Sequence, residues 1–283
     1  MLYVTGDLHG KNDVERLQPR LFGAWSNLAP DDCLLVVGDF GLPLRPDMLD
    51  CDLHLDDLAS RRHKTLFIDG NHEHHALLDS LPTVGFGGSP AGLMRENVLH
   101  LRRGYVYDVG GVSLFAFGGA SSHAGALAGY PRSERETHCE SEAERARRSL
   151  DAAGWRVDVV VTHTAPAVCL KAIHPETPRC PTAAFLDELY GRVRFSRWFA
   201  GHSHRDVDYS NGFSFVYERI LRVGDAELKD PSAPLNNLRN GLKERGTGGK
   251  STSRRRKRRS REVNAFSEVA PRNTPEPPPR TPS

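Results

Sequence analysis

Histidine, aspartate and asparagine gather in five short stretches of this 283-residue chain. The stretches are GDLHG at 6–10, GDF at 38–40, GNHE at 70–73, VTHTAP at 161–166 and GHSH at 201–204. Carboxylate, imidazole and amide groups without thiolates suit Mn²⁺, iron, Zn²⁺, Co²⁺ or Ni²⁺. Asp, Asn and Gly are also common in turns, but turns do not require histidine in four of five stretches. The residue types therefore predict a metal site.

The side chains of ligand type in these stretches are too many for one ion. They are Asp7, His9, Asp39, Asn71, His72, His163, His202 and His204. Asp-x-His and His-x-His each place two side chains just past one strand end, and seven of these eight side chains would be enough for two ions that share a carboxylate. Two ions about 3.5–4 Å apart lower the pKa of a bound water and stabilise a phosphoryl oxygen as charge develops.

The elements that position these residues alternate between β-rich runs and helical segments, which predicts an α/β fold. Helices are expected at 13–24, 46–60, 73–79, 133–153 and 182–192. The fourth is rich in Glu and Arg at i, i+4 spacing, so we expect it to be exposed. Strands are expected at 2–5, 33–37, 65–68, 97–101, 105–109, 112–117, 158–162, 197–200, 206–209, 213–217 and 220–223. The closely spaced strands after residue 197 predict a meander.

In this order, the five stretches resemble the five motifs of the calcineurin-like metallophosphoesterase superfamily, over most of residues 1–210. The resemblance implies a four-layer αββα sandwich, in which helices flank two mixed β-sheets and the metal site lies in loops at strand ends. It places the first ion on Asp7, His9, Asp39 and His204, and the second on Asp39, Asn71, His163 and His202. His72 is then the catalytic residue that protonates the leaving oxygen. His74 and His75 match no motif position, so we expect exposed or packing side chains on the following helix.

The activity implied by the resemblance is that of a dinuclear-metal-dependent phosphoesterase. Its substrates would be phosphomono- or phosphodiesters, attacked by a hydroxide that bridges the metals. We expect two divalent metal ions, Mn²⁺ in the first place and Fe, Zn²⁺, Co²⁺ or Ni²⁺ as alternatives. Two other functions stay open: a metal-dependent nuclease of the same fold, and a non-catalytic scaffold. The complete ligand set argues against the scaffold, and an acidic catalytic region argues mildly against a nucleic-acid groove.

The chain departs from two branches of this superfamily directly after Asp39. Protein Ser/Thr phosphatases and symmetrical dinucleoside-tetraphosphate hydrolases continue G-D-x-x-D-R-G, whereas this chain reads GDFGLPLRP, with Arg45 nearby. The supporting Asp and the phosphate-binding Arg of that motif are absent, which disfavours both branches. The stretch FAFGGASSHAG at 115–125 is similar to a substrate-side loop of bacterial and phage members. His123 in this loop is a candidate accessory contact, with packing as the competing interpretation.

Charge divides the chain into two regions. From Asn236 to Ser283 there are 13 Lys and Arg against 4 Asp and Glu, so the rest of the chain is net acidic. We expect a metallophosphoesterase domain at 1–228 and a disordered, basic and Pro-rich tail at 229–283, which buries too little apolar surface to fold. The run RRRKRRSR at 254–261 is a candidate for weak contact with nucleic acid or another polyanion, or a solvated segment. Arg102 and Arg103 are candidate contacts for a substrate phosphate, with solvent exposure as the competing interpretation.

Composition indicates a soluble protein outside the membrane. Apolar residues make up 38% of the chain, and runs such as LLVV are far shorter than the roughly 20 residues needed to cross a bilayer. The opening MLYVTGDLHG lacks the features of a secretory signal. The five cysteines are odd in number and have no C-x-x-C spacing, which fits a reducing compartment and argues against a cysteine-based zinc site. We therefore expect a cytoplasmic protein.

Overall fold

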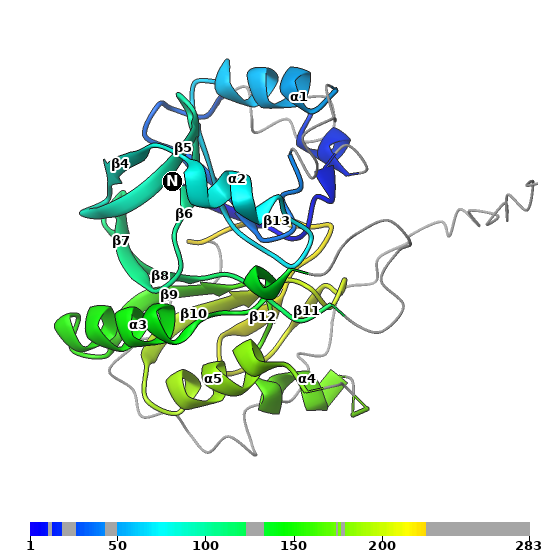
Figure 1. The fold of residues 1–283 in the computed structure, drawn as a ribbon. Coiled ribbons are helices and arrows are strands. Elements are labelled where there is room, and N and C mark those ends of the chain that lie inside the picture. The colour runs from blue at the N-terminus through cyan, green and yellow to red at the C-terminus, as the bar shows by residue number, and fades with distance from the viewer. Residues whose placement is uncertain are drawn as a thin grey trace, which may run out of the picture. The chain divides into compact units, whose positions relative to one another are not determined.

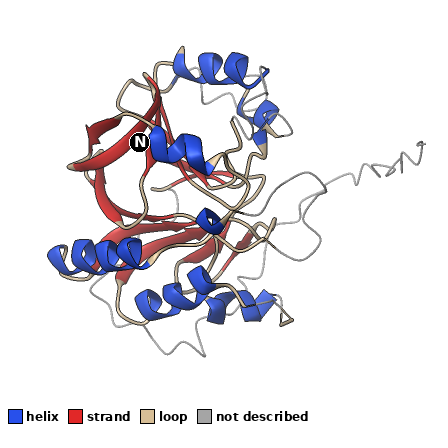
Figure 2. Ribbon diagram, in the orientation of Figure 1, coloured by secondary structure: helices blue, strands red, loops and turns tan. Residues whose placement is uncertain are grey.

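Two mixed β-sheets, each covered by helices on one face, form the part of the chain that the structure describes (Figures 1 and 2). In this computed structural model the chain separates into two compact units, Met1–Arg245 and Gly246–Ser283. The described residues belong to the first unit and are 1–10, 13–18, 27–42, 50–122, 133–173, 175–176 and 179–224. Arg45, His123, the expected boundary after residue 228 and the expected tail lie outside them.

The two sheets have seven and six strands. In order across the first sheet, the strands are β13 (Ile220–Arg222), β1 (Leu2–Thr5), β2 (Cys33–Val37), β3 (Lys64–Ile68), β6 (Val98–Leu101), β5 (Ser89–Arg95) and β4 (Thr83–Phe86). In order across the second, they are β11 (Val207–Asp208), β12 (Phe213–Phe215), β10 (Arg194–Ala200), β9 (Arg156–Thr162), β8 (Val112–Phe117) and β7 (Tyr105–Val109). Strands β1, β2, β3 and β6 run parallel in the first sheet, and β8, β9, β10 and β12 in the second. Antiparallel strands complete both sheets.

Helices cover the outer face of each sheet, which gives the expected four-layer αββα sandwich. Leucines of α1 (Asp50–Ala59) and α2 (His75–Ser80) pack in one hydrophobic cluster with the first sheet. Residues of α3 (Glu140–Ala152), α4 (Ala167–Ile173) and α5 (Pro181–Tyr190) pack in a second cluster with the other sheet. A third cluster joins the inner faces of the two sheets. In Figure 1 the two groups of helices lie on opposite sides of the strands.

The pleat of β2 shows how one strand serves two of these cores. Cys33, Leu35 and Val37 point into the cluster between the sheets, whereas Leu34 and Val36 point into the cluster beneath α1 and α2. Successive side chains of a strand face opposite sides, so a strand covered on both faces must be apolar throughout. All five residues of β2 are indeed buried. A continuous apolar run is thus required by the position of β2 between two layers.

Most of the predicted strands are confirmed, but the hairpin β4–β5 was not predicted. Its two strands join through Gly87 and Gly88, both of which have positive φ angles, and Phe86 pairs with Ser89 across the turn. A two-residue loop with positive φ at both positions matches the twist of the flanking strands, and glycine adopts it without steric cost. The helix α4 was not predicted either.

The helix predicted at 133–153 differs from expectation in length and in exposure. A short 3₁₀ helix, Glu134–Glu136, precedes α3, and the N–H of Cys139 donates to the side chain of Glu142 where α3 begins. One face of α3 is buried, through Ala143, Ala146 and Leu150. The expectation of an exposed helix was therefore wrong for this face, because alanine spacing is a weak apolar signal beside so many charges.

The predicted meander after residue 197 was also wrong. Strand β12 pairs in parallel with β10, and β13 crosses to the edge of the other sheet, where it pairs with β1. Twelve residues separate β10 from β12, enough for the crossover that a parallel pair needs. That crossover carries the GHSH stretch.

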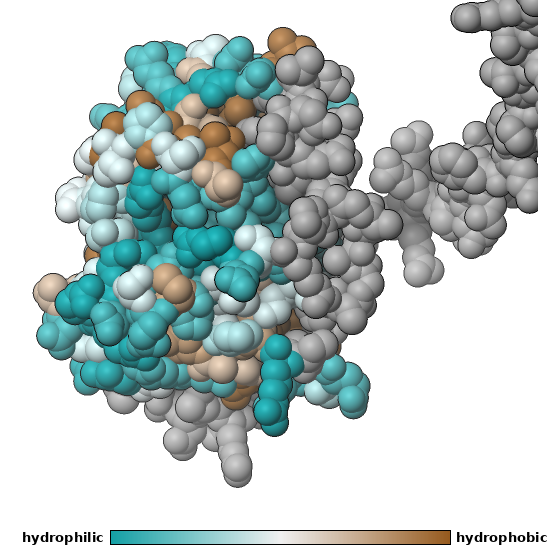
Figure 3. Space-filling view, in the orientation of Figure 1, coloured by the Kyte–Doolittle hydropathy of each residue, from teal (hydrophilic) through white to brown (hydrophobic). Residues whose placement is uncertain are grey.

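The face of the molecule that Figure 3 shows is mainly hydrophilic, with smaller hydrophobic patches. Among the described residues, Met1 and Leu53 are the exposed large hydrophobics. None of the described helices has the length and apolar character needed to cross a membrane.

The hydrophobic cluster between the sheets predicts that replacing two different leucines by alanine lowers the stability of the protein by very different amounts. Leu66 is completely buried there, whereas Leu53 on α1 is 74% exposed. Leu66→Ala should lower the free energy of unfolding by about 2–5 kcal/mol, because it removes buried methyl groups and leaves a cavity. Leu53→Ala should change it by no more than about 0.5 kcal/mol. Urea unfolding of both variants measures the difference, and equal losses would contradict the assignment of this core.

Candidate metal centre

Seven polar side chains from both sheets meet where five parallel strands end. They follow the carboxyl ends of β1, β2, β3, β9 and β10 and are Asp7, His9, Asp39, Asn71, His163, His202 and His204. Parallel strands bring their carboxyl ends to one edge of a sheet, where ligands commonly bind. The structure thus brings together all seven residues that the sequence indicated as ligands.

The first group consists of Asp7, His9 and His204. One ligand atom from each lies within 4.8 Å of the others, and His204 Nε2 is 3.1 Å from Asp7 Oδ2. The backbone N–H of His202 donates to the Asp7 carboxylate at 3.1 Å, which fixes its orientation. Asp7 is completely buried, whereas the side chain of His204 is 49% exposed. The first group is therefore anchored in the interior and open to solvent on one side.

The second group consists of Asp39, His163 and His202, with Asn71 beside them. Ligand atoms of the first three lie within 4.8 Å of one another. Asn71 Oδ1 is 3.0 Å from His163 Nε2, and its amide Nδ2 donates to Ser122 Oγ at 3.1 Å. This hydrogen bond leaves the carbonyl oxygen of Asn71 facing the group. Asn71 and His163 are both buried, whereas His202 is partly exposed.

The carboxylate of Asp39 lies between the two groups. Its Oδ2 is 3.4 Å from His9 Nε2, and its Oδ1 is 3.4 Å from His163 Nε2. Burial alone would raise the pKa of Asp39, but the charges of His163, His9 and His72 outweigh burial and lower it far below its ordinary value. The carboxylate is only 1% exposed, so its charge must be compensated within the site. This placement suits a carboxylate that bridges two cations.

His163 offers an independent test of whether the site fits a cation. Its Nδ1 is 2.9 Å from the carbonyl oxygen of Val37, and a carbonyl only accepts, so Nδ1 carries a hydrogen. In the neutral ring, Nε2 then carries a lone pair, which faces oxygen atoms of Asn71 and Asp39. Three electron-rich atoms converge, and either a proton or a metal ion must lie between them. In metal-ligating histidines, the ring nitrogen that does not bind the metal typically donates a hydrogen bond, often to a backbone carbonyl.

The electrostatics of His9 favour a positive charge in the first group. Burial lowers the pKa of His9, but a hydrogen bond to Asp39 and the charges of Asp39 and Asp7 outweigh it and raise the pKa to about 9. Its Nδ1 also lies 3.5 Å from the carboxylate of Asp13, four positions further along the chain. Groups that stabilise a proton on this ring stabilise a bound cation in the same way.

Four of the seven residues have a left-handed backbone. The φ angles of His9, Asp39, His202 and His204 lie between +46° and +61°. Among the described residues that are not glycine, only Trp155 shares this conformation. Each such angle costs of order 1–3 kcal/mol, and such residues cluster where function requires their geometry. The backbone is therefore held in strained turns at the positions that would bind metal.

The glycines of the motifs allow close contact between these turns. A Cβ atom at Gly70 would lie 2.0 Å from Asp39 Oδ1, and one at Gly38 would lie 2.1 Å from His163 Nδ1. A Cβ at position 201 would meet an Asp7 oxygen at 2.3 Å. These distances are far below van der Waals contact. Glycine is required here because the ligands of one loop occupy the space beside the next loop.

The three histidines of the GNHEHH stretch occupy different environments. His72 is half-buried, its backbone N–H donates to Asp39 Oδ1 at 2.8 Å, and its ring lies 6.0 Å from the ring of His9. His74 accepts a hydrogen bond from the N–H of Leu77 and caps α2. His75 is buried and lines a separate cavity. Only His72 lies at the metal centre.

Three supporting residues were not predicted from the sequence. Glu73 accepts hydrogen bonds from the backbone N–H groups of Phe40, Gly41 and Gly70, so it ties two metal-site loops together. Tyr217 stacks on His204, with ring centroids 4.7 Å apart. Ser122 orients Asn71, as described above. Glu73 belongs to the GNHE stretch, so the sequence could have indicated that it lies at this site. Nothing near Tyr217 in the sequence indicates that it contacts His204.

The paired arginines before β7 do not contact the candidate ligands. Arg103 is 2% exposed and forms ion pairs with Asp69 and Glu142. The interpretation of Arg103 as solvent-facing was therefore wrong. Arg102 lines the same cavity as His75, and none of the seven candidate ligands lines that cavity.

No model of a known protein family matches the chain, and no curated protein sequence matches it.

Because Asp39 contacts both ligand groups, Asp39→Asn should reduce the binding of metal ions at both. The amide keeps the shape of the carboxylate but removes the charge that would bridge two cations. We expect the variant, loaded with Mn²⁺ and desalted, to retain well under one ion per chain by elemental analysis, against two for the unsubstituted chain. Asp57→Asn, on the exposed face of α1, is the control with the same chemical change and should retain both. Two tightly held ions in Asp39→Asn would contradict the assignment.

The close contact at Gly70 predicts that one methyl group disrupts the centre. Gly70→Ala places a Cβ against the Asp39 carboxylate and should displace it, which lowers Mn²⁺ affinity by roughly tenfold or more. Gly85→Ala on β4 makes the same substitution where no atom lies within 4 Å and should leave affinity unchanged. Titration calorimetry with Mn²⁺ measures both. Equal affinities in the two variants would show that the packing around Asp39 does not shape the site.

Proposed function

We propose that this protein is a dinuclear-metal-dependent phosphoesterase and a member of the calcineurin-like metallophosphoesterase superfamily. The observation that supports this function best is the buried Asp39 carboxylate, which lies 3.4 Å from imidazoles of both ligand groups. Carboxylate, imidazole and amide donors around a shared carboxylate suit two hard or borderline divalent ions, with Mn²⁺ as our first choice. The substrates are phosphomono- or phosphodiesters.

The chain's own residues divide the work between holding the ions and handling the substrate. Asp7, His9 and His204 would hold one ion, Asn71, His163 and His202 would hold the other, and Asp39 would contribute to both. Bound there, the ions would activate water as the nucleophile and stabilise charge on the phosphoryl oxygens. The exposed side of His204 leaves this first group accessible, so a phosphoester can approach it from solvent without movement of the buried residues Asp39 and His163.

His72 is the residue that we assign to proton transfer. Its backbone is fixed by the hydrogen bond to Asp39, and its ring lies beside that of His9 at the edge of the centre. Because His72 is half-buried, its ring can reach both the centre and an incoming substrate. In the reaction it donates a proton to the departing oxygen of the ester, which avoids release of a strongly basic alkoxide.

A direct test uses purified protein reloaded with Mn²⁺ and assayed on bis-p-nitrophenyl phosphate, p-nitrophenyl phosphate and cyclic nucleotides. We expect metal-dependent release of p-nitrophenol that is lost with a chelator and restored by Mn²⁺. The ratio of diester to monoester turnover assigns the substrate class. Single- and double-stranded DNA in the same assay test the nuclease alternative. Absence of turnover on every ester, with two ions bound, would instead favour the non-catalytic scaffold.

The role of His72 predicts a dependence on the leaving group. His72→Ala should keep both ions but lose roughly 10²–10⁴-fold in kcat on alkyl esters, the range typical of a positioned general acid. The loss should be smaller on p-nitrophenyl esters, because p-nitrophenolate leaves without protonation. His74→Ala, two positions along, removes the cap of α2 and should leave kcat unchanged while it lowers stability by about 1 kcal/mol. An equal loss on alkyl and aryl esters would contradict proton donation.

A further inference from the structure

His204 is the most exposed of the seven candidate metal ligands, with 49% of its side chain open to solvent. An exposed side chain rotates among several conformers, and this freedom is lost when its ring binds an ion. Yet His204 Nε2 lies 3.1 Å from Asp7 Oδ2, in the orientation that the first ligand group needs. The neighbours of the His204 ring account for this orientation.

The ring of Tyr217 covers one face of the His204 ring. The two planes differ by only 14°, with the centroids 4.7 Å apart, so the rings form a parallel stack. The ring of His9 meets the same imidazole edge-on, at 4.8 Å and 82°. Aromatic pairs attract one another beyond the area that they bury, and the face of a tyrosine ring also attracts the positive charge of a histidine that binds a cation. Tyr217 therefore favours the ring plane that directs Nε2 toward Asp7.

The backbone of Tyr217 is held on both sides. Its N–H donates to Asp206 Oδ1 at 2.8 Å, and its carbonyl oxygen accepts from the N–H of Gly6 at 3.2 Å. A Cβ atom at Gly6 would lie 2.5 Å from the Cα of Tyr217, so glycine is needed for this approach. Asp206 lies two positions after His204, and Gly6 directly precedes Asp7. Tyr217 is therefore tied to both stretches that carry the first ligand group.

A half-buried arginine contacts the same tyrosine. The guanidinium carbon of Arg16 lies 5.7 Å from the centroid of the Tyr217 ring, within the range of a cation–π contact. Arg16 Nη2 also donates to the carbonyl oxygens of Gly6 and Asp7. Arg16 thus joins the backbone of the GDLHG stretch to the ring that stacks on His204.

We propose that Tyr217 is a positioning residue for the metal ion that Asp7, His9 and His204 would hold. It acts through His204, because the stack holds the imidazole in the orientation that binds the ion. A ligand that is oriented before the ion arrives loses less entropy on binding. Groups that orient metal-binding side chains commonly lower the metal affinity when they are removed. This inference rests on the proposed metal centre.

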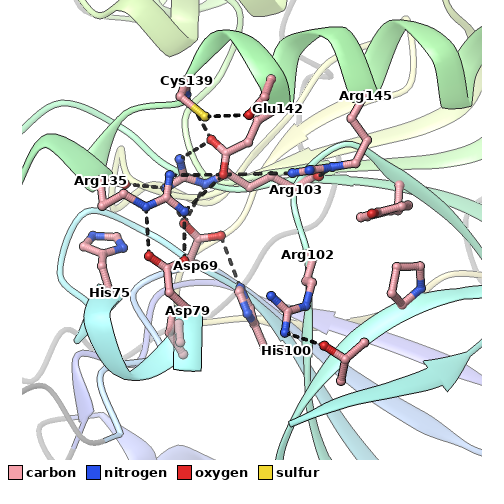
Figure 4. A pocket seen from close by; sticks show the side chains of 15 residues that line it. Asp69, His75, Asp79, His100, Arg102, Arg103, Arg135, Cys139, Glu142 and Arg145 are labelled. Carbon is pink, nitrogen blue, oxygen red and sulfur yellow. Dashed lines mark hydrogen bonds and ion pairs between the residues drawn. The ribbon is translucent and has the colours of Figure 1, made fainter. Parts of the chain in front are cut away.

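Tyr105 on β7 is the matched control for Tyr217. It is also half-buried beside an arginine, since the guanidinium carbon of Arg145 lies 4.9 Å from its ring centroid. Tyr105 and Arg145 line the separate polar cavity of Figure 4, which none of the seven candidate metal ligands lines. Arg103, Asp69 and Glu142 form an ion-pair network in the wall of that cavity. Tyr105→Leu therefore measures the effect of losing a tyrosine ring away from the metal centre.

Titration calorimetry of the full chain with Mn²⁺ tests the role of Tyr217. Tyr217→Leu should weaken one of the two binding steps roughly 3- to 10-fold, the range of one stacked aromatic pair, and leave the other step unchanged. Tyr217→Phe keeps the stacked ring and should bind both ions as the unsubstituted chain does. Tyr105→Leu should do the same. Equal affinities in Tyr217→Leu and Tyr217→Phe, or equal weakening of both steps in Tyr217→Leu, would overturn the proposal.

A second measurement needs no metal. In the metal-free protein, the Tyr217 ring shields the carbon-bound protons of the His204 ring, so their NMR resonances lie upfield of those of an unstacked histidine. These resonances are identified by their absence from His204→Gln. Tyr217→Leu should move them downfield, whereas Tyr217→Phe should leave them nearly unchanged. Resonances that stay in place in Tyr217→Leu would overturn the proposal whether or not the chain binds metal. Absence of Mn²⁺ binding by the unsubstituted chain, with the stack intact, would instead contradict the proposed metal centre.

Discussion

The carboxylate of Asp39 is the group on which the arrangement of the metal centre depends. It is buried between two imidazoles that belong to different loops, so its negative charge must be compensated by positively charged groups within the site. Its neighbours are built around it: the backbone of His72 donates to it, and Gly70 has no side chain because the carboxylate occupies that space. His163 reaches it from the second sheet. The apolar core between the sheets holds their strand ends close enough for this contact, which links the four-layer fold to the site.

The loop after β3 connects the metal centre to the cavity. Asp69 points into the ion-pair network, Gly70 contacts Asp39, Asn71 faces His163, and Glu73 ties the neighbouring loop through three backbone N–H groups. Four of the five consecutive residues 69–73 thus lie in four different environments. The backbone of this loop is fixed from both sides.

The convergence of the seven candidate ligands could be predicted because their residue types are unusual and each group follows an apolar run, as in DGNHE after β3. The α/β class followed from the alternation of strands and helices, whereas the four-layer arrangement followed from the resemblance of the five stretches to the metallophosphoesterase motifs. The hairpin β4–β5 was missed because Gly87 and Gly88 resemble a loop, although a Gly-Gly pair between β-type runs is also a hairpin signal. The burial of Arg103 could not be predicted, because its partners Asp69 and Glu142 lie 34 and 39 positions away and meet it only in the folded chain.

The central claim is that two metal ions share Asp39, and anomalous diffraction from crystals grown with Mn²⁺ tests it most directly. Data collected near the manganese absorption edge show each ion independently of the protein atoms. We predict two anomalous peaks roughly 3.5–4 Å apart. Asp39 should bind both ions, with Asp7, His9 and His204 around one and Asn71, His163 and His202 around the other. A single peak, or two peaks that Asp39 does not bridge, would contradict the account.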